Sequence, residues 1–303
     1  MHKWLGLTAI TMMFLNSSCD QQGSKPTDLR SGVEAVLKSD SAIFGLAFKD
    51  LSTGETLFIN EKESFHAAST MKTPVMIEVY KQAAKGIFSL NDSIEVKNSF
   101  SSIVDSSPYS LDSTDDSEKE LYKVLGSKRT IYQLTYDMII YSSNLATNMV
   151  IELVKADSVM QTMRSIGAND IRVLRGVEDS KAFQKGLNNT TTAYDLLLIF
   201  EKMAKGELVD QASSDAMIRI LLDQHFNEII PAELPAEVKV AHKTGSINGI
   251  QHDSGIVFLP DGRKYVLVLL SRFKGPESVP VAQMSKASKL IYDHVVKRAG
   301  ASK

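Results

Sequence analysis

Strand-like segments lie near the two ends of this chain, and the long stretch between them is helical in pattern. Helix-like spacing of apolar residues occurs at 28–38 and 284–297, and it dominates 69–205. Five short runs that favour strands occupy positions 42–49, 56–59, 238–243, 255–259 and 265–271. Strands so far apart in sequence share a sheet only if the chain returns on itself. The pattern predicts an α/β (α+β) fold: an antiparallel sheet, flanked by helices and built from both chain ends, with an inserted all-helical domain.

The same order of segments predicts the domain boundaries. We expect an α/β domain from residues 28–66 and 206–303, and a helical domain over 67–205 that includes a long loop at 175–189. With 303 residues, 43% of them apolar, the chain is large enough to form a packed enzyme. The net charge of -2 argues against a nucleic-acid partner and against a charge-driven membrane contact. We expect a small-molecule or cell-wall partner instead.

The first 27 residues predict an export segment outside the fold. A short cationic start precedes an apolar run over 4–15, which is shorter than the roughly 18 residues that a membrane-spanning helix needs. Cys19, the only cysteine, lies where a lipoprotein signal places its lipidated residue. We expect a lipoprotein-type signal peptide over 1–19, a tether over 20–27, and a periplasmic or cell-envelope protein anchored through Cys19. A soluble exported protein with ordinary cleavage is the alternative.

Ser69 and Lys72 form the first motif that suggests chemistry. They are three residues apart at the expected start of a helix, so the lysine amine can reach the hydroxyl and take its proton. A helix N-terminus also stabilises a developing anion. The spacing alone is weak, because Ser271 and Lys274 repeat it after a strand. A helix N-cap is the plain structural alternative for Ser69.

A second motif follows the apolar helical segment at 132–141. The hydroxyl of Ser142 could pass a proton to a leaving nitrogen, while the amide of Asn144 could hold a carbonyl group of a substrate. A loop serine and a capping asparagine are the ordinary alternative.

A third motif ends a predicted strand. Lys243 supplies a cation, and Thr244 and Ser246 supply hydroxyls that suit a carboxylate. Gly245 lets a substrate lie against the strand, because it has no side chain there. A strand that simply ends in a turn is the alternative for this motif taken alone.

These three elements, in this order and context, resemble those of the class A serine β-lactamases and the penicillin-binding serine peptidases. The flanking segments also match: residues 190–193 lead into a helix after the loop, Asn148 follows Asn144 by one turn, and Asp253 enters the next strand. The resemblance covers essentially the whole mature chain. It implies a β-lactamase/transpeptidase-like fold, no cofactor and a monomer. No metal is expected either, since the histidines show no zinc-ligand spacing.

The resemblance implies a role for each motif. Ser69 would attack a lactam carbonyl with the assistance of Lys72, and Ser142 would protonate the departing nitrogen. Asn144 would position the acyl side chain, and backbone N–H groups of Ser69 and Ser246 would form an oxyanion hole. The side chains implied to hold the substrate carboxylate are those of Lys243, Thr244 and Ser246.

The loop at 175–189 departs from the family pattern. Family members carry a glutamate two places after the arginine that matches Arg175, and an asparagine four places after that glutamate. Here Glu178 comes one place late, and Ala182 stands where the asparagine would fall. Glu178 is the best candidate for the base that activates the deacylating water. The alternative is an exposed loop carboxylate paired with Lys181 or Lys185.

Two other features carry less weight. Class A enzymes usually have an aspartate where this chain has Ser143, and that residue is structural in the family. The acidic, serine-rich stretch at 112–120 is interpreted as a solvated loop without a chemical role.

The leading hypothesis is a serine β-lactamase that hydrolyses the amide bond of β-lactam antibiotics through an acyl-enzyme on Ser69. The altered loop leaves two alternatives open. The first is a D-alanyl-D-alanine peptidase, or a related serine amidohydrolase or esterase, that acts on cell-wall peptide. The second is a penicillin-binding sensor that is acylated once and does not turn over.

Overall fold

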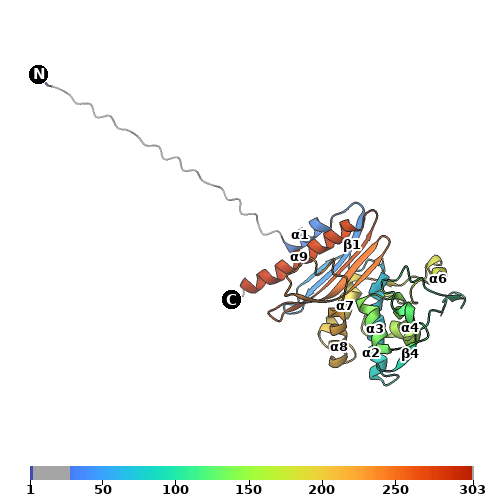
Figure 1. The fold of residues 1–303 in the computed structure, drawn as a ribbon. Helices are drawn as coiled ribbons and strands as arrows, with labels where there is room; N and C mark the ends of the chain where they lie inside the picture. The colour runs from blue at the N-terminus through green and yellow to red at the C-terminus, as the bar shows by residue number, and fades with distance from the viewer. Residues whose placement is uncertain (3–27, 302–303) are drawn as a thin grey trace.

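One five-stranded antiparallel sheet joins the two ends of the chain (Figure 1). The computed structural model describes residues 1–2 and 28–301, so Cys19, the predicted tether and nearly all of the predicted signal peptide lie outside the described residues. The strands follow the order β2-β1-β11-β10-β9, and each neighbouring pair is antiparallel. Their bounds are β1 Ala42–Asp50, β2 Thr56–Ile59, β9 Lys239–Ile247, β10 Ile250–Phe258 and β11 Lys264–Phe273. The predicted α/β fold, with a sheet built from both chain ends, is confirmed.

The strand β11 is buried on both faces, which explains its continuous apolar sequence. Leu267 and Leu269 face one side, while Val266 and Val268 alternate with them and face the other. Two helices run side by side over the first face (Figure 1). They are α1 Leu29–Leu37 and α9 Ser278–Ala301.

The helical part of the chain covers the opposite face of the sheet. Its core is continuous with that face, since Val75 and Phe200 from helices belong to one buried cluster with Ala241 and Val268 from strands. Its helices are α2 Lys72–Ala84, α3 Ile131–Ile140, α4 Asn144–Val154, α5 Ala156–Ser165, α6 Ser180–Gln184, α7 Ala193–Ala204 and α8 Gln211–Leu222. The division between residues 205 and 206 stays a prediction.

Short elements connect these layers. Three small ladders pair β3 Phe65–His66 with β8 Thr190–Thr191, β4 Ser93–Glu95 with β7 Lys128–Thr130, and β5 Phe100–Ser101 with β6 Pro108–Tyr109. Two 3-10 turns lie at Ala68–Met71 (η1) and Leu121–Val124 (η2). Within residues 28–301, no helix is both long and apolar enough to cross a lipid bilayer.

The connection between α3 and α4 places a polar turn inside the helical part. A capping box between Thr130 and Gln133 begins α3, and the buried helix then ends at Ile140. Ser142 follows in the left-handed region, at φ 57°. Ser143 then caps α4, because its hydroxyl accepts a hydrogen bond from the Ala146 N–H. The second predicted motif is therefore a tight turn between two packed helices.

Candidate active site

Ser69 lies in η1, which leads directly into α2, so it stands at the start of a helix as the sequence predicts. The turn begins at Ala68, whose φ of 46° lies in the left-handed region. The strand β9 lies close against the turn at Gly245, where an added Cβ would be 3.1 Å from Thr70 Cγ2 and 3.2 Å from Ser69 N. Gly245 therefore lets the strand approach the Ser69 turn, a role that differs from the space for substrate expected from the sequence.

Two fully buried lysines share the hydroxyl group of Ser142. Lys72 Nζ donates hydrogen bonds to Ser142 O at 2.7 Å, to Ser142 Oγ at 3.1 Å and to Asn144 Oδ1 at 3.0 Å. Lys243 Nζ donates to Ser142 Oγ at 3.1 Å from the side of the sheet. The structure thus brings Lys72 of the first predicted motif and Lys243 of the third together around Ser142 of the second.

Burial changes the protonation of both lysines. It lowers the pKa of the Lys72 ammonium to about 7, although the charges of Asp116 and Glu178 oppose this change. Burial and the charge of Lys72 lower the pKa of Lys243 well below its usual value, while Asp253 opposes that change. A hydroxyl can donate to a neutral amine while it accepts from an ammonium. The shared hydroxyl can therefore carry a proton from one lysine toward a substrate atom.

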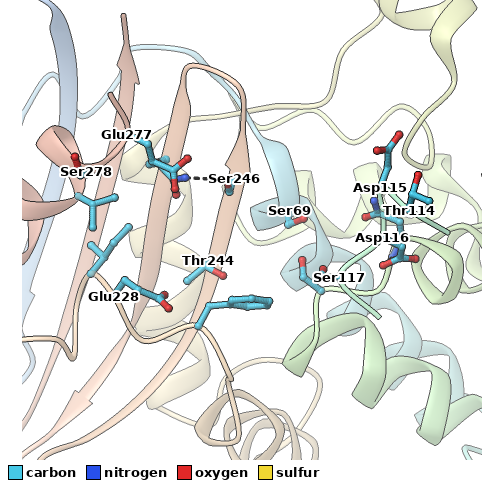
Figure 2. Close-up of a pocket in the computed structure, with 16 residues that line it drawn as sticks. Ser69, Thr114, Asp115, Asp116, Ser117, Glu228, Thr244, Ser246, Glu277 and Ser278 are labelled. Atoms are coloured by element: carbon cyan, nitrogen blue, oxygen red, sulfur yellow. Dashed lines mark hydrogen bonds between the residues drawn. The ribbon is translucent and has the colours of Figure 1, made fainter. Parts of the chain in front are cut away.

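A cleft of about 690 Å³ opens over this group of side chains. Figure 2 shows Ser69 between two walls, one formed by Thr114, Asp115, Asp116 and Ser117, the other by Glu228, Thr244, Ser246, Glu277 and Ser278. Ser142 and Asn144 line the same cleft. Four of the lining residues are acidic, and none of the described residues that line the cleft is Lys or Arg.

The loop after α5 closes on itself at its base. The Arg175 side chain donates to Leu187 O at 3.0 Å and to Asn188 Oδ1 at 3.2 Å. Asn189 accepts from the Leu174 N–H at 2.8 Å and donates to Arg175 O at 3.0 Å. These bonds across 12 to 15 residues hold the loop as one unit against the helices.

Glu178 points from this loop toward Asn144. Asn144 Nδ2 donates to Glu178 Oε1 at 2.7 Å, so Asn144 links Lys72 to Glu178 through its two side-chain atoms. A second cavity of about 500 Å³ is lined by both Glu178 and Ser69. Burial raises the pKa of the Glu178 carboxyl, and the Asp116 charge adds to the rise. Lys181, the alternative partner of Glu178, bonds instead to Asp105 at 2.8 Å.

The sequence profile of a beta-lactamase enzyme family matches residues 28–295. The chain belongs to this beta-lactamase enzyme family. It is similar to beta-lactamase VEB-1 of Pseudomonas aeruginosa, with 26% identity over 301 residues and 95% of each chain covered. A solved beta-lactamase structure from Sphaerobacter thermophilus is 26% identical, has a TM-score of 0.74, and is matched over 86% of this chain and 95% of that one. The structure of PBP-A shares the fold, with 23% identity, a TM-score of 0.77, and 90% and 97% coverage.

Two residues outside the recognised motifs shape the site of this family member. Asp116 is 3% exposed and lines the main cleft, so the interpretation of 112–120 as a solvated loop is wrong at this position. Asn148 holds Val177, the residue before Glu178: it accepts from the Val177 N–H at 2.6 Å and donates to the Val177 carbonyl at 3.0 Å. The only sequence signal for the contact between Asn148 and Val177 is that a polar residue lies one turn after Asn144.

Other polar residues near the motifs have structural partners. His242 of β9 bonds to Asp253 of β10 at 2.8 Å, and both side chains are buried. Arg272 pairs with Glu63 at 2.9 Å, outside the residues that line the main cleft. Ser271, in the repeated serine–lysine spacing, is fully buried and donates to a strand carbonyl. The second serine–lysine pair, Ser271 and Lys274, is therefore not part of the site.

Gly176 offers a direct test of the loop geometry. An added Cβ would lie 2.2 Å from Asn148 Oδ1, so Gly176→Ala is expected to lower the free energy of unfolding by about 1–3 kcal/mol. Urea denaturation measures this change. In an Asn148→Ala background, which removes the clashing atom, the same substitution is expected to cost much less. Equal costs in both backgrounds would contradict the proposed contact.

Proposed function

We propose that this protein is a serine β-lactamase that hydrolyses the amide bond of β-lactam antibiotics through an acyl-enzyme on Ser69. The observation that carries the proposal is the Ser142 hydroxyl held between buried Lys72 and Lys243, within the cleft that Ser69 also lines. Membership of the beta-lactamase enzyme family supports it. So does the similarity to VEB-1, a protein named as a beta-lactamase.

Acylation needs a base for Ser69 and an acid for the leaving nitrogen. With its pKa lowered to about 7, Lys72 is partly a neutral amine near pH 7, and we assign to this amine the removal of the Ser69 hydroxyl proton as the oxygen attacks the carbonyl carbon. The proton passes from Lys72 to Ser142 Oγ, and the Ser142 proton goes to the nitrogen as the carbon–nitrogen bond breaks. Lys243 stabilises the Ser142 oxygen during this transfer.

Substrate binding falls to the edge of β9. We assign Thr244, Ser246 and Lys243 to the substrate carboxylate, since the two hydroxyl residues line the cleft and Lys243 lies beneath them. Backbone N–H groups of Ser69 and Ser246 would hold the carbonyl oxygen, and one such donor is worth about 3 kcal/mol in the transition state. Asn144 would hold the acyl side chain through its amide.

Deacylation is assigned to Glu178. It shares a cavity with Ser69, which gives room for a water between the carboxylate and the ester carbon. The raised pKa of the carboxyl suits a base that must take a proton from water. Asp179, the neighbouring carboxylate, caps α6 and accepts from Ser102 at 2.9 Å, so it is already occupied.

A second candidate activity is removal of the terminal D-alanine from a cell-wall peptide. The observation that favours it is that Val177 stands at the place where the family pattern puts the deacylating glutamate. Asn148 holds the Val177 backbone there through two hydrogen bonds. A non-turnover penicillin sensor is favoured by the same observation. We further propose export and lipid anchoring through Cys19, and action as a monomer.

Turnover separates these functions. Purified protein is expected to hydrolyse many equivalents of a chromogenic cephalosporin, and Ser69→Ala none. Release of D-alanine from a pentapeptide without lactam turnover would instead support the peptidase. A single equivalent followed by a stable adduct would support the sensor.

Glu178→Gln is expected to trap the acyl-enzyme. It keeps the size of the side chain but removes the base, so deacylation should slow by about 10²- to 10⁴-fold while acylation persists. Intact-mass spectrometry over time would show an adduct that accumulates. The control is Glu152→Gln, a surface residue paired with Lys97, which should behave as the parent protein. Unchanged turnover in Glu178→Gln would remove Glu178 from the mechanism.

The pH dependence of acylation tests Lys72. The Lys72 amine can accept a proton only above its pKa, so the acylation rate should rise with pH through about 7. Stopped-flow measurement of the pre-steady-state phase follows this step. Lys72→Arg stays protonated at all working pH values and should lose the phase throughout. An acylation rate that is flat from pH 5 to 9 would contradict the role of Lys72 as base.

The acidic walls of the cleft predict a preference by charge. Lactams with a cationic side group should show a higher kcat/KM than anionic analogues with the same ring, because Asp115, Glu228 and Glu277 attract the cation. The ratio should fall with added salt and in the double variant Glu228→Gln/Glu277→Gln. A ratio that salt and this variant leave unchanged would show that these carboxylates do not select substrates.

A further inference from the structure

The helix α4 begins without the carboxylate that the family usually carries at its N-cap. Ser143 is fully buried, and its hydroxyl serves one N–H group, that of Ala146, at 3.2 Å. The first N–H groups of a helix have no partner within the helix and need one from elsewhere. The N–H groups of Asn144 and Leu145 are therefore left to another residue.

Asp116 is that residue, although it lies 28 positions earlier in the chain. The Asn144 N–H faces both carboxylate oxygens of Asp116, at 3.0 and 2.9 Å, and the Leu145 N–H donates to Oδ2 at 2.9 Å. A carboxylate at a helix N-terminus also gains from the helix dipole. One buried side chain thus completes the cap that Ser143 begins.

Asp116 is itself held in place. The Tyr122 hydroxyl donates to Oδ2 at 2.9 Å, and the Glu118 N–H donates to Oδ1 at 3.1 Å. Burial and the Asp116 charge raise the pKa of the Tyr122 hydroxyl above its usual value, so it remains a donor. With these bonds, both carboxylate oxygens are occupied and their direction is set.

The capped residue connects the reactive groups of the site. Asn144 accepts from Lys72 and donates to Glu178, while its own N–H is bound to Asp116. Two charged groups, Asp116 and Glu178, raise the pKa of Lys72 against the effect of burial. Lys243 lies on the other side of the shared Ser142 hydroxyl. Asp116 therefore acts on Lys72 in two ways: it holds Asn144, a hydrogen-bond partner of Lys72, and its own negative charge raises the pKa of Lys72.

We propose that Asp116 is a positioning residue of this site: its carboxylate, supplied by an earlier loop, replaces the aspartate that the family usually carries at position 143 and fixes the turn from Ser142 to Asn144 against Lys72. The inference rests on the proposed function where activity is its readout. It gives the segment at 112–120 a purpose within the site.

A swap of the carboxylate between the two positions tests this proposal. Asp116→Asn should lower kcat/KM for a cephalosporin on the order of 10- to 100-fold. It should also move the rise of the acylation rate with pH to lower pH, since the Asp116 charge that raises the pKa of Lys72 is removed. The double variant Asp116→Asn/Ser143→Asp should recover most of kcat/KM and return this rise to the pH at which it occurs in the parent protein. Glu120→Gln, an exposed residue of the same segment that pairs with Lys123 outside the cleft, should leave this part of the profile in place.

A measurement without substrate separates this inference from the proposed function. Titration of the Lys72 side chain by ¹³C NMR, in protein labelled at lysine Cε, should show a lower Lys72 pKa in Asp116→Asn and its return in the double variant. This holds even if the protein hydrolyses no lactam. An unchanged Lys72 titration in folded Asp116→Asn, or a double variant no better than the single one, would overturn the proposal.

Discussion

The burial of two lysine side chains around one hydroxyl is the constraint on which the rest of this site depends. An ammonium removed from water costs several kcal/mol unless partners replace the lost hydration. Lys72 finds those partners in Ser142 and Asn144, and Lys243 finds them in the Ser142 hydroxyl and the Thr244 carbonyl. The pKa of each lysine is lowered because these partners offset only part of the free energy lost on burial. A lowered pKa is also what allows an amine to act as a base near neutral pH.

The fold brings these groups together from three separate elements. Lys72 belongs to α2, Ser142 to the turn between α3 and α4, and Lys243 to the strand β9 from the far end of the chain. The sheet must be built from both chain ends for β9 to lie beside the Ser69 turn, where Gly245 allows the close approach. The arrangement of strands that explains the core therefore also explains the site.

Much of this arrangement could be predicted from the sequence. The strands and outer helices follow apolar periodicity. The serine and lysine motifs are each weak alone, and their order along the chain is what indicates a shared site. Asp116 could not be predicted in this way, because an acidic, serine-rich segment has the same composition whether it is solvated or folded back onto a helix N-terminus. The contact between Asn148 and Val177 was equally hidden, since it joins a side chain to the backbone of a residue 29 positions away. Local pattern carries no information about such pairings.

The site of acylation by a penicillin tests the central claim most directly. A rapid acid quench, followed by proteolysis and mass spectrometry of the peptides, would locate the bound penicilloyl group. The account predicts an adduct on the peptide that contains Ser69, formed within the first turnover, and none on the peptide that contains Ser271. An adduct on any other residue, or protein that stays unmodified while the penicillin is hydrolysed, would contradict it.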